Sequence, residues 1–335
     1  MKNRYNSIDT IRAIAIIFVV IGHVIDIMQI RNRLTNEIWQ IVYDAIYTFH
    51  MPMFFVVSGF VECINRKNIG IKDSLVKNII SLYVPYVVFN FVYWLERALA
   101  GVLFNVQMVE GAEKTWSEIL PLFYMGKGPS WFILALLLIK TVFHIFDYYL
   151  SDVWANLILF ICFAAYYLGV AKGTFWSWLS YGIFFVVGYY LSKYLCYVEK
   201  KKYLVGTASL LMLVLGIKSF VKNGLSLEVK VLVGISVTVI LFLILHKKEK
   251  KSWCYLLGQN SMVVLMVHWI VQGIMEVVIF NVLNISSAGV GMIMLIISQL
   301  IIAVLVIYSY KNVKILYWIE YFFYPWKLWT KKASK

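Results

Sequence analysis

Two side chains that can carry charge lie inside the first apolar stretch of the chain. Arg12 and His23 are eleven residues apart in DTIRAIAIIFVVIGH, residues 9–23. On an α-helix this spacing is almost three turns, so both side chains share one face, roughly 16 Å apart along the axis. Burying them in lipid is costly unless they face a partner or a wet cavity. We interpret the pair as a candidate functional site. The alternative is that Arg12 reaches the membrane surface and His23 is a buried tie between helices.

A second histidine lies in the next apolar stretch, FHMPMFFVVSGF, residues 49–60. We expect His50 at a depth similar to that of His23, which favours a shared chamber within the membrane. Pro52 removes a backbone donor and frees the carbonyl of Thr48, which then needs another partner. Ser58 and the glycine after it would let a neighbouring helix approach closely. The alternative is a kinked packing helix with a hydrogen-bonded histidine.

A third polar series occurs late in the chain, in LGQNSMVVLMVHWIV, residues 257–271. His268 follows Ser261 by seven residues, and Glu276 follows eight residues later, so all three lie near one helical face. An imidazole and a carboxylate within one span are costly and indicate either a functional site or a polar contact between helices.

The elements that must position these residues are membrane-spanning helices. The chain is 62% hydrophobic and only 14% charged, with a mean hydropathy of +0.79, which excludes an ordinary soluble domain. Apolar stretches of about 20 residues predict an all-α polytopic membrane protein, and the short alternation of barrel strands is absent. We expect about ten transmembrane helices, at 11–30, 42–62, 79–103, 131–150, 153–171, 175–195, 203–220, 229–246, 257–283 and 288–310.

The distribution of charge predicts the orientation. With both termini cytoplasmic, the inner segments hold 20 of the 31 Lys and Arg residues. The net charge of +14 is therefore attributed to topology and not to nucleic acid. The first span is not expected to be a cleaved signal peptide. The four cysteines are scattered and predict neither a disulfide framework nor a metal site. We expect a multi-pass protein of the cell membrane, in particular a bacterial plasma membrane.

Three further segments have two interpretations each. The inner loop 63–78 carries Arg66, Lys72 and Lys77, which either attract a polyphosphate or only signal topology. The loop 104–130 leads to Trp131 and is either a lid or acceptor contact, or a re-entrant segment beside an ordinary interfacial tryptophan. The tail 311–335 mixes lysines with aromatic residues and predicts an interfacial anchor on the cytoplasmic side.

Taken together, these motifs resemble the acyltransferase-3 family of integral membrane acyltransferases. The resemblance rests on Arg12 and His23 in the first span, on FHMPMFFVVSGF in the second, and more weakly on PSWFILALLL (129–138) and LGQNSMVVLMVHW (257–269). It covers the whole chain, with residues 1–310 as one transmembrane domain. It points in particular to short, single-domain members that O-acetylate cell-surface sugars. Family members commonly carry arginines before the third span, where this chain has Lys72 and Lys77, so the donor-phosphate site there is in doubt.

The resemblance implies an acyl-CoA donor, usually acetyl-CoA, no permanently bound cofactor, and a sugar acceptor that is free or lipid-linked. His23 would be the general base, and His50 a second polar group that orients the thioester or completes a relay. Arg12, held by Asp9 three residues earlier, would bind a donor phosphate or stabilise the bundle. A different class, a transporter or flippase for lipid-linked sugars or small solutes, also uses intramembrane charges. The residues expected to support substrate binding are Ser58, Trp131, Ser261, His268 and Glu276.

Overall fold

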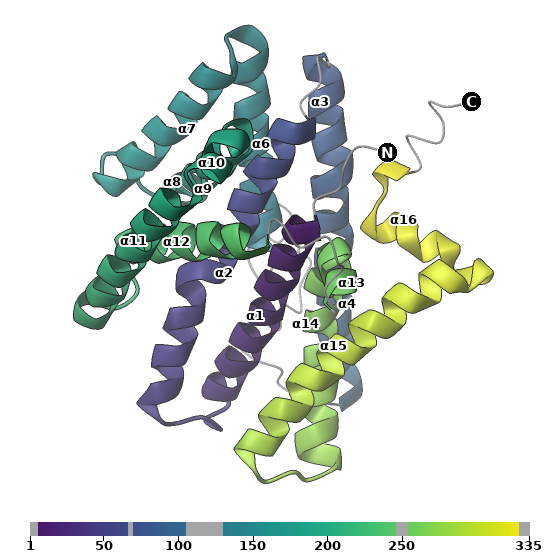
Figure 1. The fold of residues 1–335 in the computed structure, drawn as a ribbon. Coiled ribbons are helices and arrows are strands. Elements are labelled where there is room, and N and C mark those ends of the chain that lie inside the picture. Colours follow the sequence, from purple (N-terminus) through teal and green to yellow (C-terminus); the bar gives the residue numbers. More distant parts are fainter. Residues whose placement is uncertain (1–5, 66–69, 105–129, 246–253, 328–335) are drawn as a thin grey trace. The chain divides into compact units, whose positions relative to one another are not determined.

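The protein is helical throughout the part that the structure describes. The computed structural model describes residues 6–65, 70–104, 130–245 and 254–327, and every regular element within these ranges is a helix (Figure 1). Apolar segments in lipid satisfy all their backbone hydrogen bonds internally only as helices or closed barrels. The predicted all-α class is therefore confirmed for the described residues.

The number of spans is less simple than predicted. Eight helices in the described ranges are long and apolar enough to cross a membrane: Asn6–Ile30, Glu37–Asn65, Ile71–Glu96, Trp131–Tyr149, Lys202–Asn223, Leu227–Leu245, Ser261–Val282 and Ala288–Asn312. Two expected spans are shorter. Asp152–Tyr167 has 16 residues, and the stretch 175–195 is divided at Tyr181 into two helices. The count of ten is thus not confirmed, and the cytoplasmic location of both termini stays a prediction.

Two compact units make up the chain, and each combines segments that are distant in sequence. The first unit is Met1–Gly22, Thr35–Gly70 and Val142–Ser261, and the second is His23–Leu34, Ile71–Thr141 and Met262–Lys335. Helices α1 (Asn6–Ile30) and α6 (Trp131–Tyr149) contribute residues to both, and α14 (Ser261–Val277) does so through its first residue, Ser261. The predicted domain boundary at residue 310 stays a prediction.

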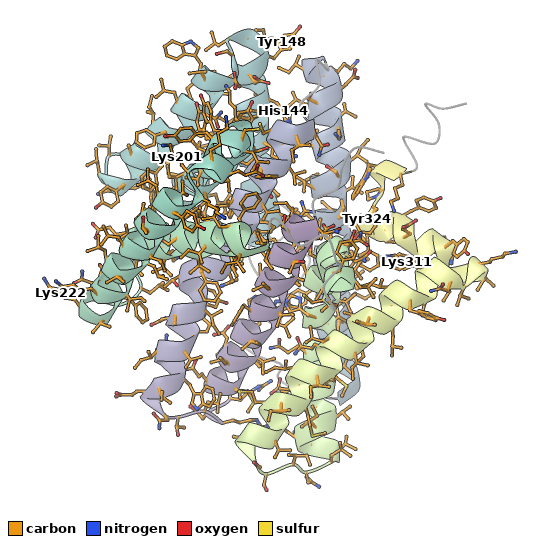
Figure 2. The ribbon with its side chains drawn as sticks, viewed as in Figure 1. His144, Tyr148, Lys201, Lys222, Lys311 and Tyr324 are labelled. Atoms are coloured by element: carbon orange, nitrogen blue, oxygen red, sulfur yellow. The ribbon has the colours of Figure 1, made fainter. Side chains whose placement is uncertain are left out.

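The first unit is organised around α2. Besides its parts of α1 and α6, its helices are α2 (Glu37–Asn65), α7 (Asp152–Tyr167), α8 (Thr174–Ser180), α9 (Gly182–Lys193), α10 (Leu195–Lys200), α11 (Lys202–Asn223), α12 (Leu227–Leu245) and α13 (Tyr255–Gln259). Helix α2 packs against α9 and α12, and α11 lies along α12 (Figure 1). The exposed side chains of Lys201 and Lys222 lie at opposite ends of α11 (Figure 2).

Glycines bring α2 and α9 into backbone contact. A Cβ atom on Gly59 would lie 1.9 Å from the carbonyl oxygen of Phe185, and one on Gly188 would lie 1.8 Å from that of Val56. No side chain fits at such separations, so the crossing requires glycine on both helices. The close helix approach that Ser58 and Gly59 predict is therefore present.

The turn of α2 around Pro52 is packed against α12. Helix α2 continues through Pro52, which cannot donate to the carbonyl of Thr48. Gly234 of α12 lies directly against this point, since a Cβ there would be 2.5 Å from Pro52 Cβ and 3.0 Å from the Thr48 oxygen. The small residue lets α12 cover the irregular turn and keeps it from lipid.

The second unit holds the late helices and the chain around Pro85. Besides its parts of α1 and α6, its elements are α3 (Ile71–Asn78), η1 (Ile79–Tyr83), α4 (Val84–Phe104), α14 (Ser261–Val277), η2 (Val278–Val282), α15 (Ala288–Asn312), η3 (Lys314–Ile319) and α16 (Glu320–Phe323). The element η1 is a π-helical turn in which the N–H of Val84 donates to the carbonyl of Ile79, five residues back. Pro85 follows at once, so the wide turn absorbs the proline and the helix continues.

The described part of the tail packs against this unit. Phe323 is buried, and its ring stacks on that of Phe89 in α4 with 5.2 Å between centroids. The tail therefore makes a tertiary contact through Phe323, in addition to any contact with the membrane surface.

Candidate active site

Two histidines from opposite ends of the chain lie together in the second unit. The ring centroids of His23 on α1 and His268 on α14 are 5.4 Å apart, with 33° between the ring planes. Gln272, one turn beyond His268, donates from Nε2 to the backbone carbonyl of His23 over 3.1 Å. This bond fixes the register of the two helices, so the imidazoles are held as a pair.

The backbone fixes the tautomer of His268. Its Nδ1 lies 3.0 Å from the carbonyl oxygen of Val264, four residues earlier on the same helix. Because a carbonyl only accepts, we assign the proton to Nδ1, which leaves a lone pair on Nε2 when the ring is neutral. The side chain is 0% exposed. His268 is therefore oriented as a hydrogen-bond acceptor beside His23.

Three polar atoms on this stretch of α14 lack hydrogen-bond partners within the described residues. They are His268 Nε2, Trp269 Nε1 and Gln272 Oε1, and all three are buried. Buried polar atoms in folded proteins almost always have partners, so a cluster of exceptions indicates a place where a substrate or water completes the bonding. The cluster supplies one donor and two acceptors beside His23.

Trp269 connects the histidine pair to a cavity. Its ring lies 5.0 Å from that of His23 and 5.6 Å from that of Tyr93 on α4, both in edge-on geometry. Trp269 and Tyr93 also line a cavity between α4, α6 and α14. The site thus has a proton acceptor, a donor group and an adjoining space within one unit.

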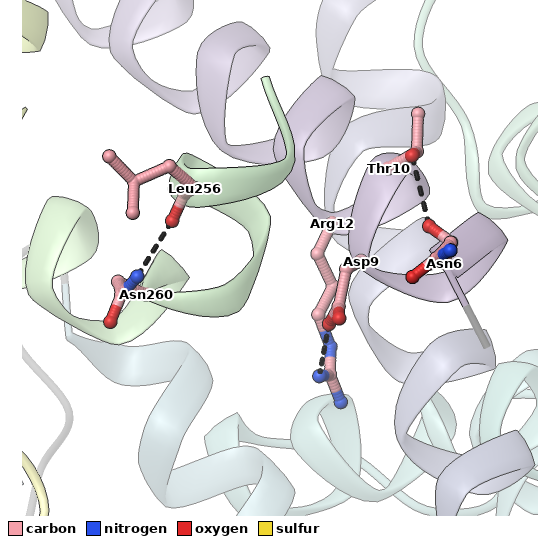
Figure 3. Close-up of polar contacts among 6 residues, drawn as sticks. All are labelled: Asn6, Asp9, Thr10, Arg12, Leu256 and Asn260. Carbon is pink, nitrogen blue, oxygen red and sulfur yellow. Dashed lines mark hydrogen bonds and ion pairs between the residues drawn. The ribbon is translucent and has the colours of Figure 1, made fainter. Parts of the chain in front are cut away.

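Arg12 and Asp9 form a contact near the start of α1, in the first unit (Figure 3). Arg12 Nη1 lies 3.5 Å from Asp9 Oδ1, as the spacing of three residues predicts. Asp9 is buried, whereas the Arg12 side chain is 27% exposed. The backbone of Asp9 also meets α13, since a Cβ on Gly258 would lie 1.7 Å from the Asp9 carbonyl oxygen.

His50 is buried in the first unit and is hydrogen-bonded to its own helix. Its Nδ1 lies 2.7 Å from the carbonyl of Ile46, and the ring meets that of Tyr47 edge-on at 4.6 Å. The imidazole is 1% exposed. As for His268, the carbonyl fixes the proton on Nδ1 and leaves Nε2 as the acceptor. His50 and His23 belong to different units.

The other predicted support residues have separate surroundings. Ser58 donates to the carbonyl of Phe54 in its own helix. Ser261 and Trp131 are the first residues of α14 and α6, and both are half-buried. Glu276 pairs with Arg31, with 2.9 Å between its Oε1 and the arginine Nε. Glu276 therefore belongs to an ion pair further along α14 and not to the histidine pair.

The basic residues predicted to bind a donor phosphate are only partly described. Lys72 and Lys77 are exposed on α3 in the second unit. Arg66 lies outside the described residues. Among the residues that the structure describes, no group of three or more His, Cys, Asp or Glu side chains could hold a metal ion.

Several residues of the site were not predicted from the sequence. Gln272 lies four residues after His268 and four residues before Glu276, so all three share one face of a helix. This spacing could have identified Gln272 as a residue of the site. Asn90 and Ser130, which line the cavity, are hydrogen-bonded to each other from α4 and the residue before α6. A lone amide inside an apolar span, such as Asn90, is itself a sign of a polar contact between helices.

Comparison with known proteins agrees with the motifs. Residues 5–310 match the model of a family described as "Acyltransferase domain". The chain is also similar to the nodulation protein NolL of Sinorhizobium fredii, with 42% identity over 60 residues. That match covers 18% of this chain and 16% of the relative's length, so the chain spans only a small part of it. No solved structure matches the chain significantly.

Proposed function

The chain belongs to the acyltransferase-3 family, and on that premise we propose that it transfers an acyl group, acetyl in particular, from acyl-CoA to a hydroxyl of a cell-surface or lipid-linked sugar. The match over residues 5–310 supports membrane acyltransferase activity. The donor, the acceptor and the base are our additions. The observation that carries them is the His23–His268 pair on α1 and α14, beside three buried polar atoms that lack partners within the described residues.

His23 is the general base in this proposal. A sugar hydroxyl is a poor nucleophile at neutral pH, and a neutral imidazole can take its proton as the oxygen attacks the thioester carbonyl carbon. The new ester C–O bond forms, the C–S bond breaks, and the proton passes from His23 to the departing CoA thiolate. The His268 ring packs beside that of His23 and limits how it can turn, and the lone pair on His268 Nε2 remains available to a bound group.

The indole N–H of Trp269 is the donor that we assign to the carbonyl oxygen. Negative charge develops on that oxygen as the tetrahedral intermediate forms, and a preorganised donor in a buried site stabilises it. Trp269 Nε1 is buried and has no hydrogen-bond partner among the described residues. Its ring meets that of His23, so the base and the donor act on neighbouring atoms of one reacting centre.

The donor enters from the cytoplasm in this proposal, because CoA is too highly charged to cross lipid. With the amino terminus inside, Lys72 and Lys77 on α3 are the cations that meet its phosphates, and a phosphate contact from Arg12 of the first unit stays a prediction. The acceptor approaches from the other side, in the plasma membrane of a bacterial cell. His50 remains a second polar group of the first unit for which we propose no step.

Acceptor-dependent release of CoA tests the activity. The purified protein would be incubated with acetyl-CoA, with and without surface polysaccharide from the cells that produce it. The free thiol of released CoA would be measured. A transferase releases CoA when acceptor is present and adds the mass of one acyl unit to the polysaccharide. A transporter moves its substrate unchanged and leaves the thioester of acetyl-CoA intact. If no free CoA is released when acceptor is present, the proposal is overturned.

The base is tested by His23→Ala. Loss of a general base slows transfer by about 10²–10⁴-fold, while the protein should still elute as a folded species in detergent. His144→Gln is the matched control, because His144 contacts Glu62 in the first unit at 3.4 Å and has no part in the proposed chemistry. Normal transfer by His23→Ala would remove His23 from the mechanism.

A further inference from the structure

We infer that the side chain of Arg33, which follows the end of α1, binds an anionic group of the acceptor, either a carboxylate or a phosphate. The inference rests on the proposed acyl transfer and adds the class of acceptor, a sugar chain that is itself acidic or is linked through phosphate. The site consists of Arg31, Arg33, Glu276 and Phe280, and all four residues belong to the second unit.

Arg33 is held on an aromatic ring. Its guanidinium carbon lies 3.7 Å from the centroid of the Phe280 ring, which is itself buried. The ring is confined by α15, because a Cβ on Gly291 would lie 2.3 Å from Phe280 Cζ. Contact through the face of a guanidinium leaves the N–H donors at its edge for a carboxylate or phosphate. Phe280 therefore holds the positive charge in place without pairing it.

The neighbouring carboxylate is shared between two cations. Glu276 pairs with Arg31 at 2.9 Å, and Arg33 lies near the same carboxylate. Two arginines and one glutamate leave one positive charge in excess. In addition, Arg33 Nε is buried and has no hydrogen-bond partner among the described residues. Because buried polar atoms almost always have partners, the excess charge and the unbonded donor indicate that an anion completes the site.

The site is aligned with the histidine pair along the same two helices. Arg31, directly after α1, follows His23 by eight residues. On α14, Glu276 follows His268 by the same number. Because the residues at both ends of this interval are in contact, the two segments run side by side in the same direction. Eight residues rise roughly 12 Å along a helix, so the reacting hydroxyl and the anionic group belong to different parts of the acceptor.

The position of Arg33 favours the acceptor over the donor. With the amino terminus cytoplasmic, as the distribution of charge predicts, α1 begins at the cytoplasmic face and Arg33 lies toward the opposite face. In the proposed mechanism CoA stays on the cytoplasmic side, whereas the acceptor approaches from the side of Arg33. The Arg31 side chain is 29% exposed, so a group outside the helix packing can reach the site.

Removing the charge of Arg33 tests the inference. Arg33→Gln keeps a side chain that can pack on Phe280, and it should raise KM for the acceptor about tenfold while kcat and KM for acetyl-CoA stay unchanged. Arg33→Lys keeps the charge but loses the planar edge of donors, so its effect should be smaller. Lys314→Gln is the matched control, because it removes an exposed cation of the same unit that is not part of the site.

Two forms of the acceptor identify the anionic group. CoA release would be measured in detergent with the released surface polysaccharide and with its lipid-linked precursor. A higher KM of Arg33→Gln with both forms places the group on the sugar chain. In that case, converting the carboxylates of the polysaccharide to methyl esters and removing its phosphates should abolish the difference from the wild type. A higher KM with the lipid-linked form alone assigns the group to the phosphate of the carrier.

Three results would overturn the inference although the transferase remains. The first is an acceptor KM that Arg33→Gln changes no more than Lys314→Gln does, with both forms of the acceptor. The second is a rise in KM for acetyl-CoA instead, which would assign Arg33 to the donor. The third is an effect that appears only after anionic phospholipid is added, which would assign Arg33 to a lipid headgroup. If the wild type releases no CoA with either acceptor, the proposed function itself fails.

Discussion

The imidazoles of His23 and His268 lie 5.4 Å apart between ring centroids, although one belongs to the first helix of the chain and the other to α14. Neither residue alone distinguishes a catalytic group from a buried tie between helices. Their pairing supports the catalytic role that we propose, because His268 has a fixed tautomer whose acceptor nitrogen has no hydrogen-bond partner among the described residues. Two structural ties would be expected to satisfy each other or a neighbour.

Coupling between the two histidines is the first prediction. If His268 acts by holding the His23 ring in position, His268→Ala should lower kcat by about 10²-fold and leave KM for acetyl-CoA unchanged. The double variant should then be no slower than His23→Ala alone, since residues that act as a unit are not additive. Losses that multiply in the double variant would mean independent roles. The measurement is steady-state release of CoA by purified protein.

The close packing of α13 on α1 should depend on Gly258. A side chain there would lie 1.7 Å from the backbone oxygen of Asp9, which cannot rotate away. Gly258→Ala should therefore destabilise the protein by about 1–3 kcal/mol through forced movement of the backbone. Thermal unfolding in detergent measures this. Gly289→Ala is the control, because nothing lies within 4 Å of a Cβ at that position, and an equal loss there would contradict the packing argument.

Removing Arg31 alone should destabilise the protein more than removing the charges of both Arg31 and Glu276. Arg31→Ala leaves a carboxylate whose side chain is 11% exposed without its ion-pair partner, although Arg33 stays nearby, and we expect a loss of about 1–3 kcal/mol in unfolding free energy. Adding Glu276→Gln should restore much of that loss, because the uncompensated charge is removed. Unfolding midpoints of the two single variants and the double variant complete the cycle. A double variant as unstable as the sum of the singles would show that the residues act separately.

The exposed lysines of α3 should affect the donor and not the chemistry. Replacing both Lys72 and Lys77 by Ala should raise KM for acetyl-CoA by about tenfold, the value of one charge-assisted contact, with little change in kcat. The effect should vanish with acetyl-pantetheine, which lacks the nucleotide phosphates. Lys222→Ala, an equally exposed lysine of the first unit, is the control. An unchanged KM would exclude α3 from donor binding.

The sequence by itself determined the class of fold and the local contacts. Long apolar runs in lipid have to be helical, so the helices followed from composition and hydropathy. Contacts within one helix depend only on residue spacing, which is why the Asp9–Arg12 pair could be predicted. The apolar surroundings of His23 and His268 also showed that burying these side chains costs free energy. The sequence could not show which residues they contact.

Only the tertiary structure decided which distant residues meet. Gln272 bonding to the backbone of His23, Glu276 pairing with Arg31, and the cavity between α4, α6 and α14 all depend on how separate helices pack. In lipid, any apolar helix face can pack against another at similar energy, so hydropathy does not choose the partner. The partner is chosen by close packing, as at Gly59 and Gly188, and by hydrogen bonds between the few buried polar atoms. Neither of these can be predicted from a single segment.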